Sequence, residues 1–201
     1  MPSSNSKEWF EKAEIDYFAA FVKLWLSFNA LYKRLYQNSQ NLRSDRDYIE
    51  ELKNNNNVIM RRFIQMFSTT NTSTEAQEFK FYLQELFKAY GGNIINSKSI
   101  FRDDEKGVKP QMNRTNLQEL NFSAFIHPNN NRLKAKSVNG YIKIERLFIQ
   151  DNGYDLWPYL LEIIYMVRCM LVHGVMDPTA ENHKLIQSTF IVLRHLIKEE
   201  V

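Results

Sequence analysis

The chain has 201 residues, of which 44% are apolar and 24% are charged. This length suits a single domain, and the balance of apolar and charged residues is that of a globular protein and excludes an intrinsically disordered chain. The single cysteine, Cys169, excludes an intrachain disulfide and a cysteine-rich zinc site, and the net charge of +3 is too small to indicate a partner.

The N-terminal sequence and the longest apolar stretch lead us to expect a cytoplasmic protein that does not span a membrane. The opening residues, MPSSNSKEWFEK, lack the apolar run that follows the basic start of a secretory signal. The most apolar stretch, Tyr17 to Tyr32, is interrupted by Lys23 and is shorter than the roughly 20 residues that a membrane-spanning helix requires. A lone cysteine also fits a reducing compartment.

The first predicted element is a long helix over residues 7–36. Apolar side chains recur there at helical spacing, at Phe10, Ala13, Tyr17, Phe21, Leu24, Phe28, Leu31 and Leu35. A second apolar set makes the helix apolar nearly all round, which predicts burial on more than one side. We interpret its aromatic stripe as core and not as a surface for stacking bases: Trp25, Phe28, Tyr32 and Tyr36.

A second helix is predicted to begin after Ser44, which suits the N-cap position. Asp45 and Asp47 follow at the positive end of the helix dipole. The helix is predicted to run to about Ser68, although the four asparagines of residues 54–57 weaken its middle.

A third helix is predicted from about Glu75 to Tyr90, with either Ser73 or Thr74 as its N-cap. Gly91 and Gly92 are predicted to end it, because glycine is common just after the last helical turn.

The middle of the chain, residues 91–140, is predicted to be an irregular insertion of about 45 residues rich in Asn, Ser, Lys and Gly. Residues 98–146 carry ten Lys/Arg and five Asp/Glu, so a polyanion would meet this segment first. A solvated basic surface is the alternative interpretation. At its end, residues 141–149 fit either a strand or a helix.

The C-terminal part is predicted to contain two more helices. The first covers about residues 156–172, with Pro158 in its first turn and Gly174 as the left-handed residue that ends it. The second covers about residues 179–200. The whole chain, residues 1–201, is therefore predicted to be a single all-α domain.

Two residues of the apolar C-terminal helix carry the clearest chemistry. Arg168 lies among hydrophobic residues, and an arginine cannot lose its proton, so it needs an anionic partner there. His173 follows at the helix end. The structural alternative is an arginine paired with a carboxylate such as Glu162 and a histidine that only caps the last carbonyls. Five helical residues separate two side chains by about 140° around the axis, so the pair converges only if the helix unwinds or if two copies of the chain cross.

The segment from Arg168 to His173, RCMLVH, resembles the Arg-x4-6-His motif of the HEPN superfamily. Tyr165 precedes it, Cys169 lies within it and Gly174 follows it, and the aromatic stretch LWLSFNALY near the N-terminus also agrees with the family pattern. The resemblance covers both ends of the chain and leaves the middle unmatched. It implies a HEPN-like helical bundle that forms a homodimer through its motif helices.

The resemblance also implies a metal-independent endoribonuclease of toxin or antiviral defence systems that needs no cofactor. Arg168 would hold the scissile phosphate, and His173 would act as general base or general acid. RNA would be guided by basic residues of the middle segment, namely Lys134, Lys136, Lys143 and Arg146, and an antitoxin or regulatory protein would be a further partner. Cys169 stands where many active members have a polar residue, often Asn.

Two alternatives remain beside the nuclease. One is a non-catalytic HEPN-like module that binds RNA, a nucleotide or a protein, and the other is a helical bundle without an active site. The remaining histidines, His127, His183 and His195, lack the spacing of metal ligands and are interpreted as structural. Cys169 is interpreted as a packed thiol, because no partner base accompanies it.

Overall fold

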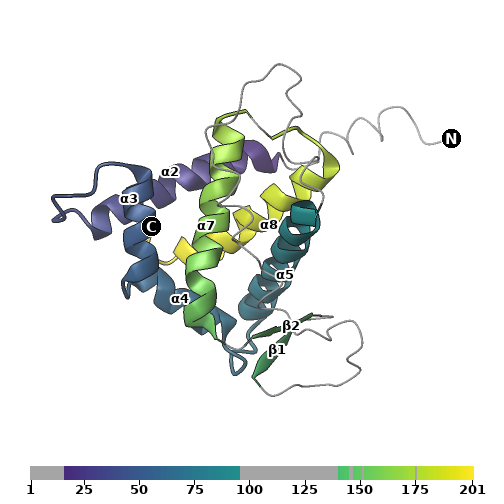
Figure 1. The fold of residues 1–201 in the computed structure, drawn as a ribbon. Helices are drawn as coiled ribbons and strands as arrows, with labels where there is room; N and C mark the ends of the chain where they lie inside the picture. Colours follow the sequence, from purple (N-terminus) through teal and green to yellow (C-terminus); the bar gives the residue numbers. More distant parts are fainter. Residues whose placement is uncertain (1–15, 96–139, 145–146, 151, 175) are drawn as a thin grey trace.

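The computed structural model describes residues 16–95, 140–144, 147–150, 152–174 and 176–201 (Figure 1). Six α-helices and one short β-hairpin follow one another along this part of the chain. The predicted all-α class is confirmed, with the hairpin as a small addition. Most of the predicted insertion, together with Lys134 and Lys136, lies outside the described residues.

Helix α2 (Tyr17–Leu35) covers the second part of the first predicted helix, whose residues 7–15 lie outside the described part. The carboxylate of Asp16 accepts hydrogen bonds from the backbone N–H groups of Phe18 and Ala19 at 3.0 and 3.4 Å. Asp16 has extended backbone and caps the helix at Tyr17, so the prediction of one unbroken helix from residue 7 was wrong. Some of the predicted core positions are buried, namely Phe21, Trp25, Phe28, Leu31 and Tyr32, while Tyr17, Leu24, Leu35 and Tyr36 are partly buried. The predicted burial on more than one side was wrong at Val22 and Leu26, which are exposed because no described element packs over that side of the helix.

The single helix predicted up to Ser68 was wrong, because two helices form there: α3 (Asp45–Asn54) and α4 (Val58–Phe67). Asn55 has extended backbone and ends α3. The side-chain oxygen of Asn57 accepts a hydrogen bond from the first turn of α4 at 2.9 Å, and its amide donates to the Leu52 carbonyl at 2.9 Å. Asparagine side chains that bond the backbone compete with helical hydrogen bonds, and here they break the helix.

Helix α5 (Thr74–Ile95) is longer than predicted. Ser73 is its cap, because its hydroxyl accepts a hydrogen bond from the Ala76 N–H at 3.2 Å. The predicted end at Gly91 and Gly92 was wrong, since the helix runs on beyond both. A glycine weakens a helix by about 1 kcal/mol but does not forbid helical backbone.

The sequence of residues 141–149 fits either a strand or a helix. In the structure this region forms an antiparallel hairpin of β1 (Tyr141–Ile144) and β2 (Leu147–Gln150). Tyr141 lies opposite Gln150, and Ile144 lies opposite Leu147. Each strand is 4 residues long, and the three isoleucines, Ile142, Ile144 and Ile149, fit the preference of β-branched residues for extended backbone. The hairpin packs beside α5.

Helix α7 (Gly153–Val172) begins three residues before the predicted start. The side chain of Asn152 accepts a hydrogen bond from the Asp155 N–H at 3.3 Å and caps it. Pro158 was predicted to lie in the first turn of the helix. Because the helix begins earlier than predicted, Pro158 lies in its second turn. Proline has no N–H to donate, so the hydrogen-bond ladder lacks one rung at this point.

The last helix, α8 (Ala180–Ile197), agrees with the prediction apart from its end. The hydroxyl of Thr179 accepts a hydrogen bond from the Asn182 N–H at 3.2 Å and caps the helix. It packs mainly against α5 and α2.

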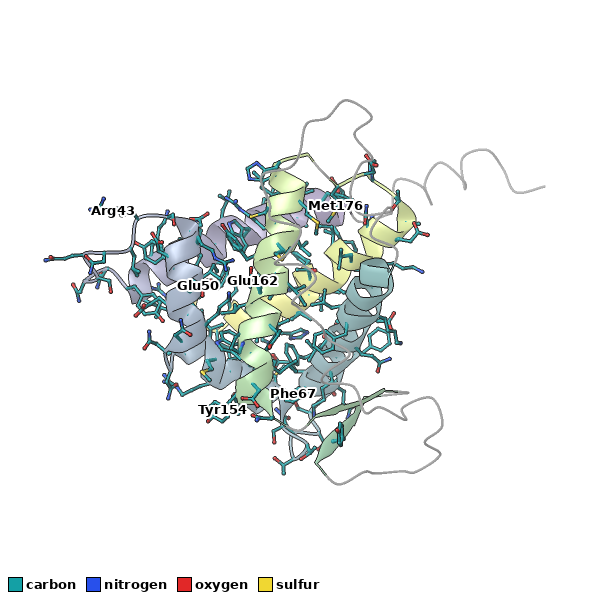
Figure 2. All side chains as sticks on the ribbon, in the orientation of Figure 1. Arg43, Glu50, Phe67, Tyr154, Glu162 and Met176 are labelled. Atoms are coloured by element: carbon teal, nitrogen blue, oxygen red, sulfur yellow. The ribbon has the colours of Figure 1, made fainter. Side chains whose placement is uncertain are left out.

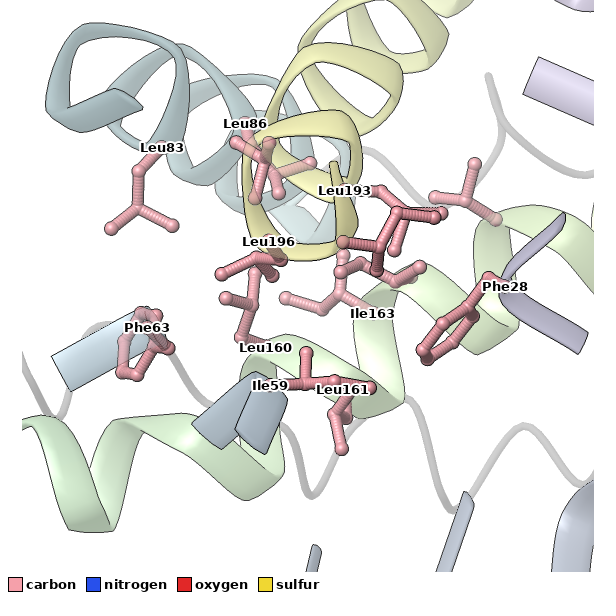
Figure 3. Packing of buried hydrophobic residues seen from close by; sticks show 14 of the residues in the cluster. Phe28, Ile59, Phe63, Leu83, Leu86, Leu160, Leu161, Ile163, Leu193 and Leu196 are labelled. Carbon is pink, nitrogen blue, oxygen red and sulfur yellow. The ribbon is translucent and has the colours of Figure 1, made fainter. Parts of the chain in front are cut away.

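The core lies where α7 crosses the other helices (Figure 1). Side chains from α2, α4, α5, α7 and α8 meet in one apolar cluster (Figure 3), among them Phe28, Ile59, Phe63, Leu86, Leu160, Ile163, Leu193 and Leu196. No helix in the described part of the chain is both long and apolar enough to cross a membrane.

One carboxylate on α7 is buried against α3 (Figure 2). Glu162 accepts a hydrogen bond from Arg46 at 2.6 Å and another from Lys53, and its side chain is 9% exposed. Glu50 on α3 bonds the same two cations at 2.5 and 3.0 Å, but it is 43% exposed. Burial raises the pKa of Glu162, but the two cations outweigh burial and hold its pKa below its ordinary value.

Replacing Glu162 tests this buried cluster. The substitution Glu162→Gln leaves two cations beside a neutral amide and should lower the free energy of unfolding at neutral pH by about 3 kcal/mol. Because the pKa is lowered on folding, this stabilisation exists above the ordinary value of 4.5 and is lost as the pH falls below it. Urea unfolding above and below pH 4.5 measures the free energy of unfolding of both proteins. The difference between the wild type and Glu162→Gln should become smaller in acid.

Glu50→Gln is the matched control, since it faces the same cations from an exposed position. It should cost less than about 1 kcal/mol. If Glu162→Gln and Glu50→Gln lowered the free energy of unfolding equally, burial would not explain the contribution of Glu162.

Candidate functional site

The predicted motif lies at the C-terminal end of α7. The helix continues through Val172, and His173 is its C-cap, with a backbone N–H that donates to the carbonyls of Cys169 and Leu171. Gly174 then adopts a φ of 66°, the left-handed conformation that the sequence predicted. The helix end does not unwind before His173.

Arg168 is half-buried near this end of the helix. Its Nη2 donates to Oδ2 of Asp45 at 3.1 Å, and its guanidinium carbon lies 5.5 Å from the centre of the Trp25 ring. Its side chain is 21% exposed, while its Nε is buried without a hydrogen-bond acceptor. The guanidinium is therefore anchored on one edge and covered by an aromatic ring.

The carboxylate partner of Arg168 is Asp45 of α3. Glu162, which the sequence suggested as an example of such a partner, instead forms ion pairs with Arg46 and Lys53. Glu162 lies six residues before Arg168, which is too far along a helix for the two side chains to meet.

Asp45 is itself held by α2. Its Oδ1 accepts a hydrogen bond from the amide of Asn29 at 2.7 Å, and the same amide donates to the hydroxyl of Tyr32 at 2.5 Å. Burial, then the hydrogen bond and charge of Asp45, raise the pKa of Tyr32, so this hydroxyl stays a neutral donor to the carboxylate.

Sequence reasoning did not identify Asn29 and Asp45 as part of the site. Asp45 was read only as a residue that favours the helix dipole, and Asn29 as one letter of an aromatic stretch. The available signal was a polar amide inside an otherwise apolar turn of α2, because such a group needs a partner when it is half-buried.

Tyr165 and Cys169 support Arg168 from the same helix. The ring of Tyr165 lies 6.1 Å from that of Trp25, and the guanidinium of Arg46 lies 5.4 Å above Tyr165. Burial and the neighbouring Cys169 raise the pKa of Tyr165 to about 12. Cys169 is 6% exposed, which confirms a packed thiol, and its sulfur lies 3.8 Å from Nη1 of Arg168.

His173 is exposed at the helix end. Because α7 stays helical up to Val172, Arg168 and His173 point about 140° apart around the axis and lie about 7.5 Å apart along it. One chain therefore does not direct both side chains at a single phosphate.

Apolar side chains are exposed on the turns beside Arg168. Leu26 and Val22 on α2, next to Trp25, are 63% and 37% exposed, and Val172, one turn after Arg168, is 53% exposed. These three side chains lie on the two helices that supply Trp25 and Arg168, and contact with another molecule is one way in which exposed apolar side chains are covered.

Lys143 is the predicted RNA-guiding residue that the described part of the chain contains, and the structure does not bring it to this site. Lys143 lies on β1, beside the N-terminal end of α7, whereas Arg168 lies near the C-terminal end of a helix about 30 Å long (Figure 1). Arg146 lies outside the described residues, as do Lys134 and Lys136.

The other described histidines have structural contacts. The ring of His183 packs against those of Tyr17 and Phe18, and His195 is buried between the carboxylates of Glu75 and Glu78 at 3.4 and 3.2 Å. Within the described residues, no group of three or more His, Cys, Asp or Glu side chains is arranged to hold a metal ion.

Comparison with protein-family models, with curated proteins and with solved structures finds no match to this chain. The geometry of its own residues must therefore carry the functional inference.

The position of His173 depends on the left-handed Gly174. Gly174→Ala meets no atom within 4 Å, so its cost is backbone strain alone, and it should lower the free energy of unfolding by about 1 kcal/mol. Thermal unfolding measures this loss, and the NMR signal of the His173 ring should shift with it.

Gly140→Ala is the matched control, because its φ is 76° and it also meets nothing within 4 Å. It should lower stability comparably and leave the His173 signal unchanged. An unshifted His173 signal in Gly174→Ala would contradict the dependence.

Proposed function

We propose that this chain is a metal-independent endoribonuclease of HEPN type that acts as a homodimer in the cytoplasm. The observation that carries the proposal is the half-buried cation of Arg168, which lies on the Trp25 ring, together with the exposed His173 five residues later at the end of the same helix. A fixed guanidinium and an accessible imidazole are the two groups that RNA cleavage through the ribose 2′-hydroxyl requires.

The proposed reaction needs no metal because RNA supplies its own nucleophile. The 2′-oxygen attacks the phosphorus while an imidazole takes its proton, and the bond from phosphorus to the 5′-oxygen breaks. The leaving oxygen takes a proton from a protonated imidazole. Arg168 offsets the charge that develops on the phosphate oxygens. The products are a 2′,3′-cyclic phosphate and a 5′-hydroxyl.

A second copy of the chain is part of the proposal. Arg168 and His173 of one chain diverge around the helix, and base and acid require two imidazoles. Two crossed motif helices would place both pairs in one cleft. The exposed side chains of Leu26, Val22 and Val172 support this arrangement, because a dimer contact at this end of α7 would bury them.

Further partners follow from the proposed activity. The basic segment of residues 98–146 would meet the RNA backbone. A ribonuclease of toxin or antiviral defence systems also needs restraint in its own cell, so an antitoxin or regulatory protein is proposed as a partner.

A second candidate function is a non-catalytic HEPN-like module that binds RNA, a nucleotide or a protein. Two observations favour it: Asp45 already neutralises Arg168, and Cys169 is buried and offers only a weak hydrogen-bonding group. In that case Arg168 serves phosphate contact without reaction.

The two functions differ in RNA cleavage. Purified protein incubated with end-labelled RNA in EDTA should release fragments with cyclic-phosphate ends. His173→Ala and Arg168→Ala should each reduce the rate at least about 100-fold, because each removes a group that acts in the transition state. His173→Ala should melt close to the wild type because His173 is exposed, whereas Arg168→Ala should melt at a lower temperature because Asp45 loses its cation.

The control substrate carries a 2′-deoxyribose at the cleaved position and should resist cleavage. An activity that EDTA abolishes, or one that His173→Ala retains, would exclude the proposed mechanism. Binding of RNA without cleavage would favour the second candidate function.

The dimer is tested at Leu26. Leu26→Arg places like charges opposite each other in a symmetric contact, so it should give a monomer and little cleavage. An added cation does not repel RNA, which separates loss of dimer from loss of substrate binding. Analytical ultracentrifugation measures the mass.

Phe81→Arg is the control, because Phe81 is a 41% exposed side chain on α5. It should remain dimeric and active. A monomeric wild type that cleaves RNA would rule the dimer out.

A further inference from the structure

The guanidinium of Arg168 has one strong anchor. Nη2 donates to Asp45 at 3.1 Å, and the Trp25 ring covers one face of the group. Among the described residues, the acceptor of Nη1 is the Cys169 sulfur at 3.8 Å, which is a weak one. The direction in which Nη1 points is therefore set by the anchor on Nη2.

The anchor is rigid. Asp45 is the first residue of α3, directly after Ser44, whose capping box with Asp47 is complete in both directions. Its second oxygen is bonded to Asn29 at 2.7 Å. The carboxylate is thus fixed by two helices, α3 and α2, that both contact α7.

We propose that Asp45, braced by Asn29, is the positioning residue of Arg168: it holds the guanidinium on the Trp25 ring so that Nη1 is presented to a substrate phosphate. This inference rests on the proposed ribonuclease function. Asp45 does not touch the substrate and acts through Arg168.

The chemistry explains why a carboxylate serves here. An arginine side chain has several rotatable bonds, and its value in a transition state depends on being held in place before the phosphate arrives. Asp45 leaves one edge of the planar fork for phosphate. A guanidinium held in place gains most when negative charge develops on the phosphate oxygens, so the benefit should appear in kcat and not in KM.

The test compares two aspartates of the same helix turn. Asp45→Ala removes the anchor, and kcat for RNA cleavage should fall about 100-fold with little change in KM, as expected for a misplaced group. Asp45→Asn keeps an acceptor oxygen in place and should recover part of the lost rate. Asp47→Ala is the matched control, because it removes the capping box of α3 without contact to Arg168.

The Arg168 Nε–H signal in ¹⁵N NMR reports its position without any RNA. The signal, assigned through its loss in Arg168→Lys, should shift in Asp45→Ala and in Asn29→Ala and stay unchanged in Asp47→Ala. Equal effects of Asp45→Ala and Asp47→Ala on kcat and on this signal would overturn the proposal, as would faster cleavage by Asp45→Asn.

The two proposals fail in different ways. If the wild type does not cleave RNA, the ribonuclease function fails, and the NMR comparison still decides whether Asp45 positions Arg168. If Arg168→Ala abolishes cleavage while Asp45→Ala cleaves like Asp47→Ala, the ribonuclease function stands and the positioning role is refuted.

Discussion

Helix α7 runs through the core of the protein, yet it carries two charged side chains, Glu162 and Arg168, that cannot be left unpaired away from water. Both are neutralised by α3. Arg46 and Lys53 meet the carboxylate, and Asp45 meets the guanidinium. The docking of α3 on α7 is therefore a condition for burying α7 at all, and the core around α7 depends on it.

The two charges are satisfied to different degrees. Glu162 accepts from two cations and is nearly covered, so it has little capacity for another ligand. Arg168 donates to a single carboxylate and keeps 21% of its side chain exposed. A charge that is saturated serves stability, whereas a charge that keeps a donor is available for a ligand. This contrast separates the structural end of the α3–α7 contact from the end where the proposed site lies.

Sequence reasoning predicted the helices that carry a periodic apolar face, as in α2 and α8. It failed where local polar chemistry decides the backbone. The side chain of Asn57 bonds across the gap between α3 and α4, and this contact has no periodic signature. Gly91 and Gly92 were read as a stop, but glycine ends a helix only when the chain needs left-handed backbone, as it does at Gly174.

The candidate site was predicted in the same uneven way. Arg168 and His173 were recognised in the sequence because they lie in one short segment whose spacing resembles a known motif. Asp45 and Asn29 were not recognised in the sequence. Asp45 lies 123 residues before its partner Arg168, and Asn29 acts on Arg168 only through Asp45. Long-range polar pairs leave no local pattern in a single sequence, and only the packing of α2 and α3 on α7 reveals them.

The order of charges along α3 and α7 also bears on how the chain avoids wrong structures. Asp45 begins α3 and Lys53 lies near its end, while Glu162 precedes Arg168 on α7. In the antiparallel arrangement each charge meets its opposite. If α3 docked in the reverse direction, Asp45 would approach Glu162 and Lys53 would approach Arg168. Like charges would then lie next to each other in a contact largely shielded from water, which is unfavourable. During folding, the same four residues would thus disfavour docking of the short helix α3 on α7 in the reverse direction, which the apolar faces alone do not exclude.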